Sequence, residues 1–262
     1  MNKSKAIFKL SLIELLTEKE VIFIWSLSSA MGLITIMATW LASDKEIIGG
    51  YTKSQLVSYY FFMYIISQII GWYICWGIRE SIMNGSISNF LIKPLNYIKY
   101  LFIHELSYKI INMATQIIVG TILIIIIRSY LEFIITPKII IEIIPVLIIG
   151  IGINFLSHFI LGCTTFFFLE SHFIIFFYEI LSLTLNGLFI PLSFFPNNVL
   201  SVIKYSPFRF TYSLPAELIF NKLDSKEYLI SLIIGVAWVL ILAMLAYLIW
   251  KKGLKKYSAY GS

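Results

Sequence analysis

Charged residues are scarce in this 262-residue chain, where Asp, Glu, Lys and Arg together make up only 13% of the sequence. Soluble domains carry about 25% charged residues. Apolar residues make up 59% of the sequence, and the mean hydropathy is +0.89. This composition excludes an ordinary soluble domain and predicts an integral membrane protein.

Residues that bind metals or perform covalent chemistry are also few, with three histidines and two cysteines. Cys75 and Cys163 lie in or beside apolar runs, and neither has a neighbour at metal-ligand spacing. We therefore expect small buried hydrophobes, with neither a disulfide nor a metal site.

Three catalytic motifs are missing. The chain has no Gly-x4-Gly-Lys-(Ser/Thr) loop to hold nucleotide phosphates and no Gly-x-Ser-x-Gly nucleophile turn. His104-Glu105 begins like a zinc-protease motif, but position 108 is Tyr, so the second histidine ligand is lacking. The sequence therefore predicts a protein that is not an enzyme and that binds no cofactor itself.

The net charge of +6 has a membrane explanation. Basic residues flank membrane spans and face anionic headgroups, mostly on the cytoplasmic side. About twelve Lys and Arg fall on the side of the two termini and about eight on the other side. We expect both termini in the cytoplasm, contact with membrane lipids, and no binding to nucleic acid.

Apolar runs of about twenty residues recur along the chain, and each could cross a hydrocarbon core of about 30 Å as a helix. They do not alternate as barrel strands do. The prediction is an all-α integral membrane protein with a single transmembrane domain over residues 1–262 and an amphipathic N-terminal helix over residues 1–20. The six predicted spans are residues 21–41, 56–78, 106–127, 139–162, 173–190 and 229–250.

A short polar stretch separates the second and third predicted spans. Gly85 suits a turn that leaves the preceding helix, because glycine adopts backbone angles that other residues avoid. Ser86 and Ser88 offer side-chain oxygens that could cap a new short helix.

Apolar residues follow at helical spacing. Ile87, Phe90 and Leu91 fall at positions i, i+3 and i+4, on one face of a short helix. Pro94 disfavours helical angles at Lys93, so the helix should end there. Phe90 either docks on a partner protein or lies in the lipid interface as an aromatic anchor, and both interpretations stay open.

The run Asn84-Gly-Ser-Ile-Ser-Asn-Phe-Leu-Ile-Lys-Pro-Leu95 resembles the Gly-x-(small)-x-x-x-Leu-x-(Lys/Arg)-Pro-Leu signature of ABC-2 type transporter permeases. The usual Asp after the small residues is Ser88 or Asn89 here, which leaves the predicted fold unchanged. A second similarity covers residues 186–196, followed by Ser206-Pro207-Phe208 and Leu214-Pro215. The chain is similar to the bacterial six-span members that work with a separate ATPase.

The resemblance implies several functional features. The stretch after the second span would be the coupling helix that docks on an ABC ATPase, and this partner would bind ATP and Mg²⁺. A second copy of the permease or a related permease would complete the transporter in the cell membrane, and short re-entrant or external helices would lie between the fifth and sixth spans. The implied coupling residues are Gly85, Ile87, Phe90, Leu91, Lys93 and Pro94.

Polar residues inside the spans are candidates for a substrate route. Glu179, Ser182 and Asn186 fall at i, i+3 and i+7, and a carboxylate within a span needs a partner or water. Tyr64 and Gln68 share a face of the second span. Both groups could instead hold helices together by packing and hydrogen bonding, and the sequence does not separate the two interpretations.

The prediction is the permease subunit of an ATP-driven ABC-2 transporter that exports a drug, a peptide, a lipid-like compound or another amphiphile. The alternatives are a membrane immunity or sensor protein that binds a toxin or peptide without transport, and a membrane enzyme that acts on lipid. The sequence does not identify the substrate.

Overall fold

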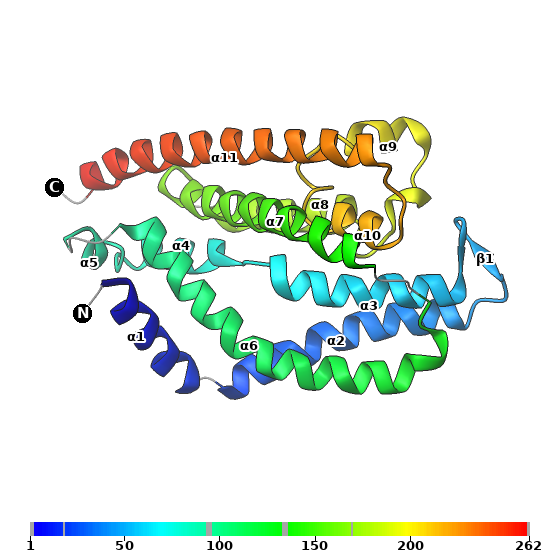
Figure 1. Ribbon diagram of the computed structural model, residues 1–262. Helices are drawn as coiled ribbons and strands as arrows, with labels where there is room; N and C mark the ends of the chain where they lie inside the picture. Colours follow the sequence, from blue (N-terminus) through cyan, green and yellow to red (C-terminus); the bar gives the residue numbers. More distant parts are fainter. Residues whose placement is uncertain (1–2, 18, 93–95, 133–135, 169, 261–262) are drawn as a thin grey trace. The chain divides into compact units, whose positions relative to one another are not determined.

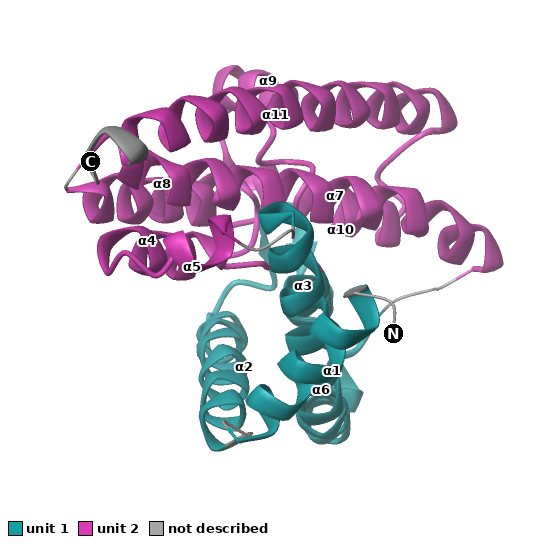
Figure 2. Cartoon of the chain, turned by 90° about the vertical axis from the view of Figure 1, so that its left-hand side faces the viewer, with its two compact units in different colours: residues 1–69, 95–134 teal, residues 70–94, 135–262 magenta. Residues whose placement is uncertain are grey.

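The computed structural model describes residues 3–17, 19–92, 96–132, 136–168 and 170–260, and its elements are labelled in Figure 1. The chain forms two compact units. One comprises residues 1–69 and 95–134, and the other comprises residues 70–94 and 135–262 (Figure 2). Helices dominate both units, so the predicted all-α class is confirmed. The prediction of a single transmembrane domain stays a prediction.

The first unit is built on four helices, and both α1 and α2 pack against α6. Between α2 and α3, strands β1 and β2 pair in a small antiparallel hairpin, and its turn residues Gly49 and Gly50 have positive φ angles of 57° and 83°. The elements are α1 (Lys3–Thr17), α2 (Lys19–Leu41), β1 (Ile47–Ile48), β2 (Tyr51–Thr52), α3 (Lys53–Ile70), α6 (Tyr97–Ile127) and the 3-10 turn η1 (Arg128–Tyr130).

The second unit is arranged around α7, which packs against α4, α8, α10 and α11. Figure 1 shows α11 running beside α7 over much of its length. The elements are α4 (Ile74–Met83), α5 (Ser88–Leu91), α7 (Pro137–Cys163), η2 (Thr164–Phe166), α8 (Ser171–Leu185), η3 (Leu192–Phe194), α9 (Asn197–Ile203), α10 (Ser213–Ile219) and α11 (Ser225–Tyr260).

The core of this unit joins α7 to α10 and α11. Val146, Ile149 and Ile153 of α7 pack against Phe210 and against buried leucines of α10 and α11. Gly150 allows this approach, because a Cβ there would lie only 3.0 Å from the backbone oxygen of Phe210.

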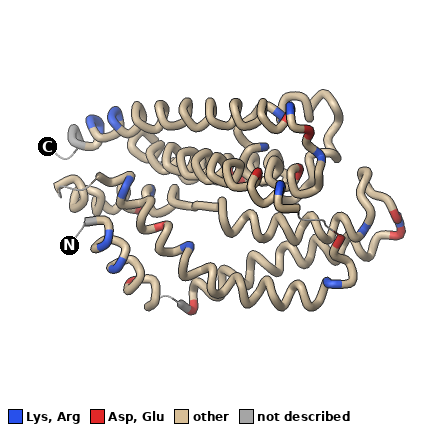
Figure 3. Tube along the Cα trace, viewed as in Figure 1, with Lys and Arg blue, Asp and Glu red and all other residues tan. Residues whose placement is uncertain are grey.

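Five helical segments in the described residues are long and apolar enough to cross a membrane. They are Glu20–Leu41, Lys53–Met83, Tyr97–Tyr130, Pro137–Phe166 and Ser225–Tyr257. The sixth candidate, α8, has 15 residues and would extend about 22 Å, less than a typical hydrocarbon core of about 30 Å. Charged residues gather toward helix ends, leaving long uncharged central stretches in α2, α7 and α11 (Figure 3). The chain is therefore a membrane protein, and the count of six spans stays a prediction.

The predicted second span, residues 56–78, lies within the candidate span Lys53–Met83, but its helix is interrupted. Helix α3 ends at Ile70, and α4 begins at Ile74. Between them the Trp72 backbone N–H donates to Asn154 Oδ1 at 2.7 Å, so a side chain of α7 satisfies a donor that the break releases. Residues 56–78 contain no proline, so the sequence gives no proline signal for this break in the helix.

Other boundaries differ at helix ends. The fifth span is predicted to reach residue 190, but α8 ends at Leu185. The helix ends there because Asn186 Oδ1 accepts a hydrogen bond from the Leu188 N–H at 2.9 Å and because Gly187, with a φ angle of 84°, turns the chain. Helix α6 begins earlier than predicted, where Asn96 Oδ1 accepts from the Lys99 N–H. Helices α2 and α7 agree closely with their predicted bounds, and α1 confirms an N-terminal helix.

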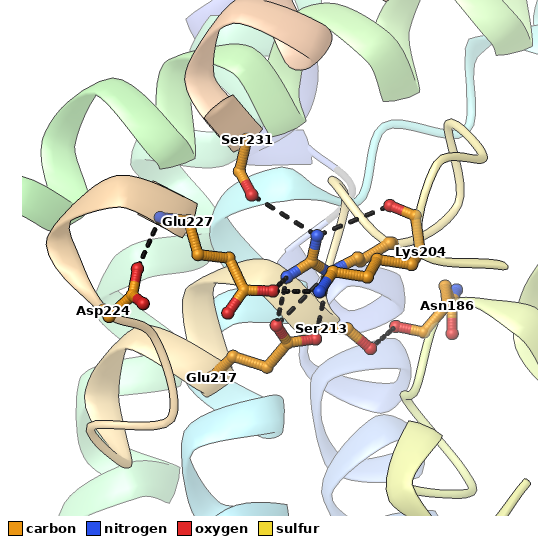
Figure 4. Close-up of polar contacts among 8 residues, drawn as sticks. Asn186, Lys204, Ser213, Glu217, Asp224, Glu227 and Ser231 are labelled. Carbon is orange, nitrogen blue, oxygen red and sulfur yellow. Dashed lines mark hydrogen bonds and ion pairs between the residues drawn. The ribbon is translucent and has the colours of Figure 1, made fainter. Parts of the chain in front are cut away.

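A charged cluster holds the chain between α9 and α11. The buried Arg209 guanidinium donates to both carboxylate oxygens of Glu217, at 3.2, 3.2 and 2.5 Å, and to Ser231 Oγ at 3.3 Å. Lys204 pairs with Glu227, the neighbour of Glu217 in Figure 4. The predicted short helices are present as α9 and α10, and their external or re-entrant position stays a prediction.

Candidate functional site

The segment after α4 makes the predicted turn at Gly85, whose φ angle is 77°. Asn84 Oδ1 accepts from the Ser86 N–H at 3.0 Å and stabilises this turn. Helix α5 then begins at Ser88, after the N-cap Ile87, and no side chain caps it. The predicted capping role of the two serines is therefore wrong, and Asn84 orders the turn instead.

A tyrosine from the end of the chain fixes this turn. The Tyr257 hydroxyl lies 2.9 Å from Ser88 Oγ and 3.3 Å from the Gly85 carbonyl oxygen. Because the carbonyl can only accept, the hydroxyl donates to Gly85 and is left to accept from Ser88. The segment is thus attached to α11 by two hydrogen bonds.

The predicted docking face is only partly exposed. Ile87 is fully buried, Phe90 is half-buried, and Leu91 and Ile92 are 43% and 83% exposed. The single face expected from spacing is wrong for Ile87, because this residue precedes a helix of only one turn and points into the unit. Lys93 and Pro94 lie outside the described residues. The outward apolar surface of the segment is therefore Leu91 and Ile92.

On α8 the three predicted route residues have different surroundings. Glu179 is half-buried, and its Oε1 accepts from Trp76 Nε1 of α4 at 2.9 Å. Ser182 is half-buried and accepts a 3.4 Å hydrogen bond from Asn186. Asn186 is fully buried, and its backbone oxygen accepts from Ser213 (Figure 4). Asn186 therefore stabilises the end of α8.

On α3, Tyr64 and Gln68 belong to a polar network inside the first unit. The buried Tyr64 hydroxyl donates to Gln116 Oε1, and Gln68 Oε1 accepts from Asn112 Nδ2 at 3.4 Å. Asn112 Oδ1 in turn accepts from Ser26 of α2 at 2.6 Å. These bonds join α2, α3 and α6, so the interhelical interpretation has direct support. The structure places Tyr64 and Gln68 in one unit and the α8 residues in the other.

The model of a protein family described as "ABC-2 family transporter protein" matches residues 23–261, nearly the whole chain. The chain belongs to the ABC-2 transporter family. No curated protein and no solved structure matches it.

Membership of the ABC-2 family explains the apolar helices and confirms the predicted family. An ABC-2 permease is a membrane subunit of an ABC transporter, so the family also implies an ABC ATPase as partner. The chain is therefore assigned to the transmembrane part of such a transporter.

Sequence reasoning missed one cluster in this ABC-2 chain. The ligating atoms of Cys75, His158 and Glu179 lie within 4.8 Å of one another. These residues come from α4, α7 and α8, which are far apart in sequence, so no local spacing could reveal the cluster. The only sequence signal was the presence of a carboxylate inside an apolar helix.

Proposed function

We propose that the chain is the permease subunit of an ATP-driven ABC exporter and works with a separate ABC ATPase. The observation that carries this proposal is the family match over residues 23–261. The proposed cargo is an amphiphile, such as a drug, a peptide or a lipid-like compound. Two copies of the permease, or this chain with a related one, would form the transporter in the cell membrane.

The segment after α4 is the proposed contact with the ATPase. Leu91 and Ile92 offer exposed apolar side chains next to the half-buried Phe90. ATP-driven closure of the ATPase would push on this segment. The push would pass to α4 through the backbone and to α11 through the two hydrogen bonds of Tyr257.

The proposed topology places both chain ends and this segment in the cytoplasm. Support comes from the lysines in the last turns of α11, at positions 251, 252, 255 and 256, because cytoplasmic flanks are enriched in basic residues. The segment from α9 to α11 would then be external. A Lys222→Cys variant should react with a membrane-impermeant thiol reagent in intact cells. Labelling only after cell lysis would contradict this topology.

Glu179, Ser182 and Asn186 stay the proposed route residues on α8, with Tyr64 and Gln68 on α3. Among the three on α8, Glu179 and Ser182 are half-buried. Glu179→Gln keeps the shape and an acceptor for Trp76 but removes the charge. We expect this variant to reach the membrane normally and to export more slowly. Normal export would remove Glu179 from the proposed cargo route.

Co-expression with a candidate ABC ATPase tests the function. The tagged chain should retain the ATPase in mild detergent, and the purified complex should hydrolyse ATP. Replacing Leu91 and Ile92 together by serine should cost about 2 kcal/mol of binding free energy, or roughly 30-fold in affinity.

Ile47→Ser is the matched control, because Ile47 is 69% exposed and lies on the β1 hairpin. Equal loss of the ATPase in both variants would contradict the proposed docking surface. A chain that protects cells from a toxin without any ATPase would favour the immunity protein instead.

A further inference from the structure

The cluster of Cys75, His158 and Glu179 has the composition of a transition-metal site. It combines a thiol, an imidazole and a carboxylate, whose ligating atoms all lie within 4.8 Å of one another. Cys75 and His158 are buried, and Glu179 is half-buried. A tetrahedral zinc site with three such ligands needs separations of about 3.4–3.6 Å, so the ligating atoms would move closer together on binding.

A backbone hydrogen bond fixes the imidazole of His158. Its Nδ1 lies 2.9 Å from the backbone oxygen of Asn154. Because a carbonyl oxygen can only accept, Nδ1 carries the proton, and the lone pair is on Nε2. Metal-binding histidines commonly donate their second ring nitrogen in this way, which fixes both the tautomer and the ring orientation.

The carboxylate of Glu179 is oriented as well. Trp76 Nε1 donates to its Oε1 at 2.9 Å, from the helix that also carries Cys75. The indole N–H and the nearby His172 imidazole compensate only part of the charge of a carboxylate within an apolar helix. A cation beside the carboxylate would compensate the rest.

Close packing of α4 on α7 brings Cys75 to His158. Gly162 lies one turn after His158 on α7, and a Cβ there would come within 3.1 Å of the Cys75 backbone oxygen and 2.7 Å of Ile78 Cβ. The Asn154 side chain also holds the start of α4 through the Trp72 N–H. The approach of these ligands is therefore built into the helix packing.

We propose that Cys75, His158 and Glu179 bind one Zn²⁺ or a chemically similar divalent ion. Binding forms a metal–sulfur bond, and the thiol proton leaves to solvent. Thiolate and carboxylate together then balance the two positive charges, so that the occupied site is neutral and suits an apolar surrounding. With three protein ligands, a fourth position is left for water or another small donor. Glu179 also belongs to the proposed cargo route, but the experiment below measures metal binding and not export, so the two proposals can fail separately.

Co²⁺ is the spectroscopic probe for this site. The full-length chain in detergent, stripped with chelator, should bind one equivalent of Co²⁺ and show thiolate-to-cobalt charge transfer and tetrahedral d–d bands. Zn²⁺ should displace the Co²⁺. Cys75→Ser should remove the charge-transfer band, and His158→Gln and Glu179→Gln should each weaken binding by tenfold or more.

Cys163→Ser is the matched control, since Cys163 is the other buried cysteine and lies outside the cluster. It should bind Co²⁺ as the unchanged chain does. X-ray absorption of the zinc-loaded unchanged chain gives a measurement that needs no variant, and should show one sulfur at about 2.3 Å and nitrogen or oxygen at about 2.0 Å.

Failure of the unchanged chain to bind Co²⁺ or Zn²⁺ would overturn the proposal. Zinc bound without a sulfur ligand would also overturn it. The same holds if Cys163→Ser abolishes the charge-transfer band and Cys75→Ser preserves it. The three side chains would then form only a hydrogen-bonding cluster.

Discussion

Removing the charge of Glu217 should destabilise the second unit. The buried Arg209 guanidinium, 4% exposed, directs three N–H···O contacts at this carboxylate. In Glu217→Gln the side chain keeps its shape and one acceptor oxygen, but the guanidinium loses its nearest negative charge. Its remaining contacts are Ser231, the Lys204 backbone oxygen and Glu227.

The size of the effect follows from burial. Breaking a fully buried ion pair by removing one partner costs about 3–5 kcal/mol. Glu217 is itself 23% exposed, and the Glu227 carboxylate lies 3.9 Å from Arg209 Nη2, so compensation is partial. We expect a loss of about 2–3 kcal/mol, which corresponds to a fall of about 4–12 °C in melting temperature for a unit of this size.

The assay is a thermal melt of the purified chain in detergent, followed by tryptophan fluorescence. Glu142→Gln is the control, because its i, i+4 partner Lys138 is 67% exposed and lies 3.7 Å away. This pair should contribute below about 0.5 kcal/mol. Replacing Arg209 and Glu217 together by methionine should destabilise less than Glu217→Gln, because no charge is left unpaired. Equal melting temperatures for Glu217→Gln and Glu142→Gln would refute this account.

Three further predictions concern helix contacts. Gly162→Ala should lower the free energy of unfolding by about 1–3 kcal/mol through its clash with α4. Gly77→Ala, with open space at its Cβ in the interior of α4, should not lower the free energy of unfolding in the same melts. Asn154→Leu should cost about 1–3 kcal/mol because the Trp72 N–H loses its acceptor, and hydrogen exchange at the start of α4 should rise. Tyr257→Phe should keep the fold but reduce export per ATP hydrolysed by the complex, whereas Tyr247→Phe, on an exposed part of α11, should not.

Apolar run length predicted the membrane helices well, because a helix in lipid must be long, uncharged and internally hydrogen-bonded. Helices α2 and α7 show this agreement most clearly. Tyr64 and Gln68 each hydrogen-bond to α6, which agrees with one of the two interpretations that the sequence left open, since polar side chains in lipid need partners on other helices.

The predictions from sequence are wrong or incomplete where tertiary contacts determine the helix ends, the burial of a side chain or the grouping of residues. The break before α4 depends on an acceptor from Asn154, 82 positions away in sequence, and a hydropathy profile cannot show it. Ile87 has the spacing of an exposed face, but burial depends on the helix length and on neighbouring elements. The metal-like cluster combines three helices, so only their packing reveals it. The proposed coupling and route residues stay predictions.

The hydrogen bonds of Tyr257 also bear on biogenesis. Tyr257 is hydrogen-bonded to Gly85 and Ser88, which lie 172 and 169 positions earlier in the sequence. A growing chain therefore contains the turn long before Tyr257 has been synthesised. During synthesis the segment lacks these two hydrogen bonds until α6 to α11 have been translated and inserted. The segment therefore reaches its final geometry only after α11 is in place. A chain truncated before α11 would present the segment to a partner without the hydrogen bonds of Tyr257.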